Sequence, residues 1–264
     1  MQLDRNDKTK FLAFCQTVLE HSFSQRFQDL WFLWETGFSR EGYFCEFGAL
    51  NGRDFSNTYI LEKLGWNGAL SEPHPDFAER VVANRNCYFS GKCIYSESDQ
   101  TLTFNVVKGR PALSAISHLV VKDEREHLRN NYRQIPVQTL SLDDFLQEAS
   151  APETIDCLSI DTEGSELSIL ESYDFTRRPI RLICVEHNGV MRDNIYQFLT
   201  KKGYSRKWPD LSGHDDWYVL ENAYPDWQLD GLNTVSETLL TFEKFEISLP
   251  ERKELMHSLT QSSV

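Results

Sequence analysis

The sequence predicts an α/β fold in which a mostly parallel sheet is covered by helices on both faces. Short apolar runs alternate with segments of helical periodicity between residues 43 and 202. Strands that alternate with helices in this way pair in parallel, because each crossover returns the chain to the same edge of the sheet. The 264 residues are 40% hydrophobic and 12% aromatic, which is enough to fill a core. No linker or internal repeat divides the chain, so one domain is expected.

Helices are expected where apolar residues recur at spacings of three and four, or where capping residues stand. Residues 8–36 show this spacing and contain two helices, the second of which Gly37 can end. Pro75 suits the first turn of a helix that runs to about Ala83, and Ser141 followed by Asp144 predicts a helix N-cap. Further helices are expected at 55–64, 165–173, 192–202 and, in an amphipathic tail, from 231 onward.

Strands are expected in the short apolar runs that glycine, proline or polar residues bound. They lie at 43–47, 68–71, 92–95, 102–107, 136–140, 155–160, 180–185, 205–208 and 217–220. Residues 109–134 instead hold Gly109, Pro111 and a charged run, which predict an irregular excursion that serves as a lid. We therefore expect a central domain over 41–222, with a helical extension at 1–40 and a helical tail at 223–264.

Charge and the absence of targeting segments limit the location and the partners. A net charge of −13 repels nucleic acid and anionic membranes at long range. The first residues lack the apolar core of a signal peptide, and no run approaches the roughly 18 apolar residues of a spanning helix. The six cysteines include no C-x-x-C pair and are expected to be reduced. These features predict a cytoplasmic protein with no membrane span and no nucleic-acid partner.

The turn after the first strand favours a ligand other than a diphosphate. Ligands of parallel sheets bind beyond the carboxyl ends of the strands. Here the chain reads Glu46-Phe-Gly-Ala-Leu-Asn-Gly52, which has neither the G-x-G-x-x-G spacing of dinucleotide sites nor the Lys-Ser/Thr of a P-loop. Glu46 would repel a phosphate but attract an ammonium group, which suits the methionyl end of S-adenosylmethionine. An ordinary strand-turn-helix explains the same residues.

The next two strand ends offer groups that suit an adenosine. Glu72 closes the second strand, where an acid can accept hydrogen bonds from both ribose hydroxyls. Ile94, Tyr95 and Ser96 follow at the third strand end and could form an adenine slot, although apolar residues there are also ordinary core. Two acids at successive strand ends of one parallel sheet are a more specific signal than either acid alone.

Polar groups also stand directly after the fourth and fifth strands, where burial without a function would be costly. Asp161 ends the fourth strand, and Glu186-His187-Asn188 ends the fifth. His187 or Asp161 can act as a general base. Asp161, Glu186 and His187 can instead hold a divalent cation such as Mg²⁺ or Mn²⁺. A third interpretation is that His187 and Asn188 cap a helix or brace the loops.

Nine short sequence blocks, in a fixed order from about Ser24 to Leu220, point to one family. They are Phe23-Ser-Gln-Arg-Phe-Gln-Asp29, Tyr43-Phe-Cys-Glu-Phe-Gly-Ala49, Ser56-Asn-Thr-Tyr-Ile-Leu-Glu62, Gly65-Trp-Asn-Gly68, Ser71-Glu-Pro73, Leu140-Ser-Leu-Asp-Asp144, Ile155-Asp-Cys-Leu-Ser-Ile-Asp-Thr-Glu-Gly-Ser-Glu-Leu167, Val185-Glu-His-Asn188 and Asp215-Asp-Trp-Tyr218. In this order the blocks resemble the FkbM-type methyltransferases, a branch of the class I S-adenosylmethionine-dependent enzymes. The excursion at 109–134 and the tail after 221 match nothing in that pattern.

The resemblance implies a class I methyltransferase fold, Rossmann-like, with a seven-stranded sheet whose last strand is antiparallel. It implies that S-adenosylmethionine lies along the first three strand ends, and that Asp161, Glu163 and His187 lie near the transferred methyl group. Glu46, Gly48 and Gly52 match the family's glycine-motif positions, and Glu72 matches its ribose-binding acid. The resemblance and the strand-end positions together give the expected cofactor-binding residues: Gln25, Glu46, Gly48, Ala49, Gly52, Asn57, Glu72, Tyr95 and Asp161.

The expected function is therefore methyl transfer to a hydroxyl oxygen, on a sugar of a surface polysaccharide, a glycolipid or a natural product. One alternative is a non-catalytic relative that binds a partner through the amphipathic tail, which also suits a homodimer. A second is a nucleotide-sugar-modifying Rossmann enzyme, which would need the pyrophosphate loop that this turn lacks. A third, transfer to nitrogen or carbon, lacks the Asn-Pro-Pro-Tyr sequence that suits an amine acceptor.

Overall fold

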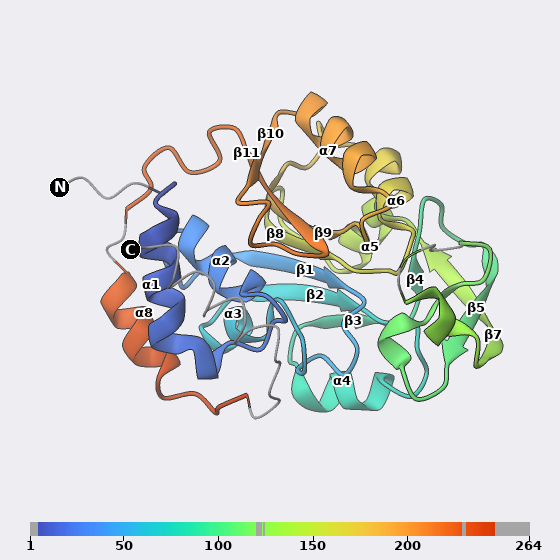
Figure 1. Cartoon of the computed structure of the whole chain (residues 1–264). Helices are drawn as coiled ribbons and strands as arrows, with labels where there is room; N and C mark the ends of the chain where they lie inside the picture. Colours follow the sequence, from blue (N-terminus) through green and yellow to red (C-terminus); the bar gives the residue numbers. More distant parts are fainter. Residues whose placement is uncertain (1–4, 120–122, 124, 229–230, 246–264) are drawn as a thin grey trace.

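The computed structural model describes residues 5–119, 123, 125–228 and 231–245. Its centre is a seven-stranded sheet with the strand order β10-β11-β9-β8-β1-β2-β3 (Figure 1). The strands of this sheet are β1 (Tyr43–Phe47), β2 (Asn67–Ser71), β3 (Tyr88–Ser90), β8 (Ile155–Ile160), β9 (Ile180–Glu186), β10 (Tyr204–Lys207) and β11 (Asp215–Leu220). The chain is thus a mixed α/β protein, as the alternation of strands and helices predicted.

The register of the sheet brings the strand ends into one row. Strands β1, β2, β3, β8 and β9 pair in parallel, whereas β11 pairs antiparallel with both β9 and β10. Phe47, the last residue of β1, pairs with Ser71 of β2 and with Ile160 of β8. The residues that follow these three strands therefore stand side by side at one edge, and Glu186 at the end of β9 pairs with Asp215.

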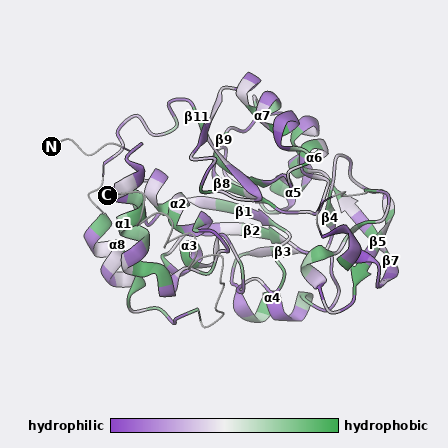
Figure 2. Ribbon diagram, viewed as in Figure 1, coloured by the Kyte–Doolittle hydropathy of each residue, from purple (hydrophilic) through white to green (hydrophobic). Residues whose placement is uncertain are grey.

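Two layers of helices cover the two faces of the sheet, because side chains alternate between faces along each strand. Phe44 belongs to a core that holds α1 (Lys8–Val18), α2 (Gln28–Glu35), α3 (Tyr59–Lys63), α4 (Ala78–Asn84) and α8 (Leu232–Leu239). Its neighbours Cys45 and Phe47 belong to the opposite core, which holds α5 (Leu142–Glu148), α6 (Glu166–Ser172) and α7 (Arg192–Lys201). In Figure 2, α1 and α7 carry both hydrophobic and hydrophilic residues, as helices that bury only one side should.

A second sheet of four strands lies beyond the carboxyl ends of the central strands (Figure 1). Its order is β4-β7-β5-β6, formed by β4 (Cys93–Ile94), β7 (Tyr132–Leu140), β5 (Thr101–Val107) and β6 (Ala115–Ile116). It has a small core of its own, which includes Phe104 and Ile116. The excursion at 109–134 is thus more ordered than predicted, since it contributes β6, the start of β7, and the short helices η2 (Pro111–Leu113) and η3 (Glu126–Arg129).

Three predicted elements differ from the structure near the ligand edge. The third strand of the central sheet is β3, not the run at 92–95, whose β4 part pairs with β7 in the second sheet. The helix expected at 55–64 begins only at Tyr59, and the helix expected from Pro75 begins at Ala78. Gly37, with φ +64°, follows α2 as predicted, and the Phe38 amide donates back to Leu33 O at 2.8 Å.

The predicted cap of α5 is confirmed, because the Ser141 hydroxyl accepts from the Asp144 amide at 3.2 Å. Cys45, Cys157 and Cys184 are buried free thiols in strands, as their apolar neighbours predicted. None of the described helices is both long and apolar enough to cross a bilayer. The part of the predicted tail after residue 245 lies outside the described residues.

Candidate active site

A cavity opens at the carboxyl ends of the central strands, where the register places the strand-end residues. It encloses about 820 Å³ of empty space, part of which is open to solvent. Four chain segments reach it: the N-terminal segment before α2, the strand ends, the second sheet and the start of β11. The lining residues are Gln25, Gln28, Phe47, Gly48, Ala49, Leu50, Asp54, Phe55, Asn57, Ser71, Glu72, Pro73, Cys93, Ile94, Phe104, Pro111, Ala112, Ser114, Asp161, Thr162, Glu163 and Asp215.

The two glycines of the turn after β1 are required by neighbouring protein atoms. A Cβ on Gly48, which has φ +77°, would lie 1.8 Å from the backbone oxygen of Asp161. A Cβ on Gly52, also at φ +77°, would lie 2.9 Å from Cγ of Arg85. In the structure these two glycines let two parts of the chain approach each other. Gly48 and Ala49 line the cavity, and Gly52 does not.

Glu72, which follows β2, presents a buried carboxylate to the cavity. One of its oxygens accepts from the Leu50 amide at 2.8 Å and the other accepts from the His74 amide at 2.7 Å. Burial raises the pKa of Glu72 to about 7, although the two backbone hydrogen bonds oppose the rise. These bonds fix the orientation of the carboxylate, so it can accept hydrogen bonds from a ligand without a further loss of side-chain conformational entropy.

Glu46 points away from the cavity, on the same face of β1 as Phe44. Its oxygens accept from the Ser56 hydroxyl at 2.7 Å, the Thr58 hydroxyl at 2.6 Å and the backbone amide of Asn57 at 2.6 Å. Glu46 is only 3% exposed and does not line the cavity. The structure therefore places this predicted cofactor residue behind the chain segment that forms the cavity wall.

Asn57 belongs to that wall and has an unused hydrogen-bond acceptor. Its amide nitrogen Nδ2 donates to the Ser159 hydroxyl at 2.9 Å. Its amide oxygen Oδ1 is buried and has no hydrogen-bond partner among the described residues, although Asn57 lines the cavity. A buried, unpaired acceptor at a cavity wall is a suitable contact for a donor group of a ligand.

The N-terminal segment is fixed in the wall by the buried carboxylate of Asp29. Asp29 accepts from the Ser22 hydroxyl at 2.7 Å, the Ser24 hydroxyl at 2.6 Å and the Phe23 amide at 2.8 Å. Ser24 also forms a β-bridge with Phe55, next to Asn57. This arrangement carries the predicted residue Gln25 to the cavity wall.

Three carboxylates meet at the ends of β8 and β9. Asp161, Glu163 and Glu186 each bring one oxygen within 4.8 Å of the others. Burial, reinforced by the neighbouring negative charges, raises the pKa of Asp161 and of Glu186 well above the usual range. Burial also raises the pKa of Glu163, although Arg129 opposes the rise. Asp161 and Glu163 line the cavity.

Two arginines of the excursion form ion pairs with these carboxylates. Arg125 donates to Glu186 at 3.2 Å, and Arg129 donates to Glu163 at 2.6 Å. Asp123 accepts from both arginines, at 3.2 Å from Arg125 and 2.5 Å from Arg129. We call Asp123 and residues 125–129 the arginine strap. It connects the excursion to the ends of β8 and β9, so the excursion is in contact with the site, as expected of a lid.

The same ion pairs bear on the predicted metal site. Divalent cations such as Mg²⁺ take oxygen ligands from carboxylates, carbonyls and waters, and a guanidinium already bound to a carboxylate competes for the same oxygens. Two of the three clustered carboxylates already accept from guanidinium groups. His187, the third predicted ligand, is replaced in the cluster by Glu163. As arranged, these residues fit two guanidinium groups better than a metal ion.

His187 and Tyr95 lie outside the cavity lining. Nδ1 of His187 accepts from the Gly189 amide at 2.9 Å, and its Nε2 lies 3.8 Å from Oδ1 of Asp216. Burial lowers the pKa of His187, although Asp216 opposes this effect. The Tyr95 hydroxyl lies 3.2 Å from Nε2 of His118, and its neighbour Ile94 lines the cavity instead. The structure thus separates His187 from Asp161 and Glu163, with which the sequence had grouped it.

Several lining residues were not predicted from the sequence. Gln28 donates to Asp215, and burial raises the pKa of Asp215 to about 6. Both residues stand in sequence blocks that mark the family, so their position there was an available signal. Phe104 of β5 carries no such signal, nor do Pro111, Ala112 and Ser114, which lie between β5 and β6. Only the non-local pairing of β5 with β7 and β6 brings these residues to the site.

Comparison with known proteins identifies the family. A family model, described as the methyltransferase FkbM domain, matches residues 46–206. This range is more than half of the chain and includes β2, β8 and β9 and the end of β1, which together form the cavity edge. No curated protein matches the sequence significantly. The chain belongs to the FkbM methyltransferase family.

Proposed function

We propose that the protein is an S-adenosylmethionine-dependent O-methyltransferase that acts on a hydroxyl group of a sugar. The observation that carries the proposal is the row of strand-end groups along one cavity: the Gly48–Ala49 turn, Glu72 and Asp161. Glu72, which follows β2, is an acid suited to binding a ribose. Asp161, which follows β8 two strands away, has a raised pKa. Family membership supplies the reaction class.

The first part of the cavity suits the donor. The Glu72 carboxylate accepts from the ribose hydroxyls, and the unused Asn57 oxygen, with Gln25 beside it, accepts from the ammonium group of the methionyl end. Ile94 and Phe104 supply apolar walls for the adenine. When bound, S-adenosylmethionine supplies an electrophilic methyl group on a sulfonium.

Asp161 is the residue best placed to take the proton of the acceptor hydroxyl. It lines the cavity, and its raised pKa brings its proton affinity closer to that of a base working near neutral pH. As the oxygen–methyl bond forms, the sulfur–methyl bond of the donor breaks and its electron pair stays on sulfur, which leaves S-adenosylhomocysteine. The proton of the acceptor hydroxyl passes to the Asp161 carboxylate. Glu163, held by Arg129, lies beside it and can orient the same hydroxyl.

A polyhydroxylated acceptor suits the group of carboxylates around Asp161. Asp161, Glu163 and Asp215 all line the cavity, and each oxygen can accept from a sugar hydroxyl. Holding the acceptor and the donor in an attack geometry can supply roughly 7–11 kcal/mol of the barrier reduction. The rest of the acceptor would lie toward the arginine strap.

The test is calorimetric titration of the protein with S-adenosylhomocysteine, followed by mass spectrometry of sugar acceptors incubated with S-adenosylmethionine. We expect micromolar binding that Glu72→Ala abolishes, and turnover that Asp161→Asn removes without weakening donor binding. Transfer to an amine, or an Asp161→Asn variant with unchanged turnover, would contradict the proposed chemistry. If the protein binds neither S-adenosylhomocysteine nor S-adenosylmethionine, a non-catalytic role in binding a partner is the remaining alternative.

A further inference from the structure

Arg85 is a buried cation that the proposed reaction does not use. It follows α4 directly, and its side chain is only 1% exposed. It does not line the cavity. Removing a guanidinium from water is costly unless charged and hydrogen-bonding partners surround it. The choice of these partners therefore indicates what Arg85 contributes.

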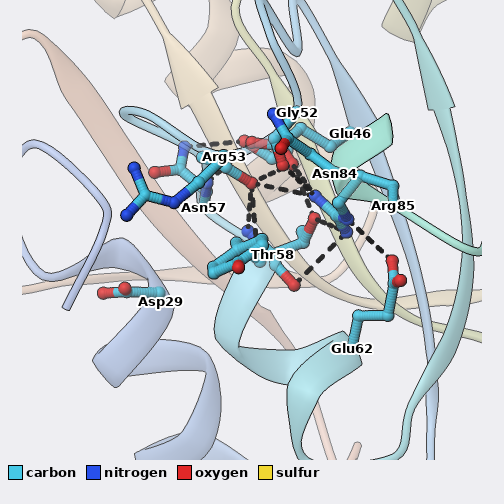
Figure 3. Close-up of polar contacts among 12 residues, drawn as sticks. Asp29, Glu46, Gly52, Arg53, Asn57, Thr58, Glu62, Asn84 and Arg85 are labelled. Carbon is cyan, nitrogen blue, oxygen red and sulfur yellow. Dashed lines mark hydrogen bonds and ion pairs between the residues drawn. The ribbon is translucent and has the colours of Figure 1, made fainter. Parts of the chain in front are cut away.

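All three nitrogens of the Arg85 guanidinium have partners, and these come from different parts of the chain (Figure 3). Nε donates to Glu62 on α3 at 2.7 Å. Nη1 donates to the backbone oxygen of Gly52 at 2.9 Å and to the Ser56 hydroxyl at 3.2 Å. Nη2 donates to the Thr58 hydroxyl at 3.0 Å. A planar group with five donors can satisfy such a set, whereas a lysine cannot.

A carboxylate on β1 completes the arrangement from the other side. Glu46 lies 3.7 Å from Nη1 of Arg85 and accepts from the same Ser56 and Thr58 hydroxyls that Arg85 contacts. It also accepts from the Asn57 backbone amide. Residues 56–58 are thus held between an arginine and a glutamate, and the Asn57 side chain is left facing the cavity.

The other end of the same contact set reaches the turn after β1. Arg85 donates to the backbone carbonyl of Gly52, and the side-chain amide of Asn84 donates to the backbone carbonyl of Asn51 at 2.8 Å. The turn also includes Leu50, whose amide donates to Glu72. Both walls of the cavity that face the donor therefore depend on the position of Arg85.

We propose that Arg85 is a positioning residue for the donor site: its guanidinium fixes residues 52–58 so that the Asn57 amide oxygen and Leu50 amide keep their places at the cavity. The inference rests on the proposed function for the identity of the donor. Arg85 touches no ligand itself and acts through Gly52, Ser56 and Thr58.

Two variants test this inference, with S-adenosylhomocysteine as the probe. Arg85→Met keeps the unbranched aliphatic part of the side chain and removes the guanidinium, with its charge and all its donors. We expect its dissociation constant to rise about tenfold or more, because small displacements of binding groups are costly. The KM for S-adenosylmethionine should rise by more than kcat falls. Hydrogen exchange at the Asn57 backbone amide should accelerate, because Arg85 no longer holds residues 56–58 in the position where this amide donates to Glu46. Arg85→Lys should give intermediate affinity.

Leu199→Ala is the matched control. Leu199 is fully buried in α7, in the core on the opposite face of the sheet, so the variant lowers stability without touching residues 52–58. If Arg85→Met and Leu199→Ala melt at similar temperatures and lose donor affinity equally, Arg85 has only a general structural role and the proposal is wrong. If Arg85→Met does not fold, wild-type affinity in Arg85→Lys would overturn it. If the wild-type protein does not bind S-adenosylhomocysteine, the proposed function is wrong. The positioning role is then tested by hydrogen exchange alone: an unchanged exchange rate at the Asn57 backbone amide in Arg85→Lys would refute it.

Discussion

The burial of Glu72 has opposite consequences for ligand binding and for stability. A pKa raised by burial to about 7, from an ordinary value of 4.5, corresponds to roughly 3 kcal/mol. The folded protein holds this proton more tightly than the unfolded chain. Glu72 therefore destabilises the fold increasingly as the pH rises from about 4.5 to about 7. Donor affinity should change the other way, because the ionised carboxylate is the better acceptor for ribose hydroxyls.

We predict that the stability of Glu72→Gln relative to wild type increases between pH 4.5 and pH 7 and is constant above it. Urea unfolding of both proteins across this range measures the difference, which isolates Glu72 from the other buried carboxyls. The loss of one accepted backbone hydrogen bond in the variant lowers the whole curve without changing its slope. If the difference in unfolding free energy between the two proteins does not change between pH 4.5 and pH 7, folding does not raise the pKa of Glu72 and the prediction is wrong.

Gly48 supports a second prediction at the scale of one residue. Gly48→Ala forces a Cβ to within 1.8 Å of the Asp161 carbonyl oxygen, in addition to the strain of φ +77°. Gly189 has a similar φ of +73° but no atom within 4 Å of the position of a Cβ. Gly189→Ala should thus cost only the strain, roughly 1–2 kcal/mol. Gly48→Ala should cost clearly more in denaturant unfolding and should also weaken donor binding, because the strand ends must separate. Equal losses would contradict the close approach of β1 and β8.

The arginine strap shows how an element outside the central sheet can supply charge to the site. Arg125 and Arg129 pair with Glu186 and Glu163 where other enzymes could place a cation. We predict that the wild-type protein keeps full activity in excess chelator and binds no Mn²⁺ in calorimetric titration. The double variant Arg125→Ala/Arg129→Ala removes the guanidinium partners of Glu186 and Glu163, two of the three clustered carboxylates. It should gain measurable Mn²⁺ binding while its acceptor KM rises.

Arg133→Ala is the control for the strap. Arg133 lies on β7 in the same small sheet and forms an ion pair only with the exposed Asp76, at 3.4 Å, among the described residues. This variant should neither bind Mn²⁺ nor change the acceptor KM. If chelator abolishes the activity of the wild-type protein and Mn²⁺ restores it, the arginines do not take the place of a metal ion.

At the scale of the whole molecule, the N-terminal segment is part of the core and not an appendage. Phe11, Trp31 and Trp34 are buried in one cluster with Phe44 and Trp217 of the central sheet. The rings of Trp31 and Trp217 stack with centroids 5.2 Å apart. We predict that a chain beginning at residue 41 does not unfold cooperatively and does not bind S-adenosylhomocysteine. Circular dichroism and calorimetry check this, and a truncated chain that binds like the full chain would contradict the prediction and support the domain boundary expected from the sequence.

The sequence predicted the strands best where local pattern alone decides. Residues 43–47 and 155–160 are apolar runs buried on both faces, and each matches its strand to the residue. The second sheet was missed as a unit because the residues of β4 and β5 that pair with β7 are 25 to 46 positions away from their partners in the chain. The direction of Glu46 could be predicted from the sequence, because side chains two residues apart in a strand share a face, and Phe44 faces the aromatic core. The roles of Arg85 and Arg125 could not be predicted, since a single arginine gives no local indication of its partner.

Both chain ends contribute helices to the same face of the sheet, and this has a consequence for synthesis. The core with α5, α6 and α7 uses residues up to 220. The core on the other face needs α1 from the start of the chain and α8 together with Phe245, whose amide donates to Glu20 O at 2.7 Å. On the ribosome, the core that holds these tryptophans and phenylalanines is therefore incomplete until α8 and Phe245 have been synthesised. Until then the nascent chain exposes a surface that chaperones recognise and that favours aggregation.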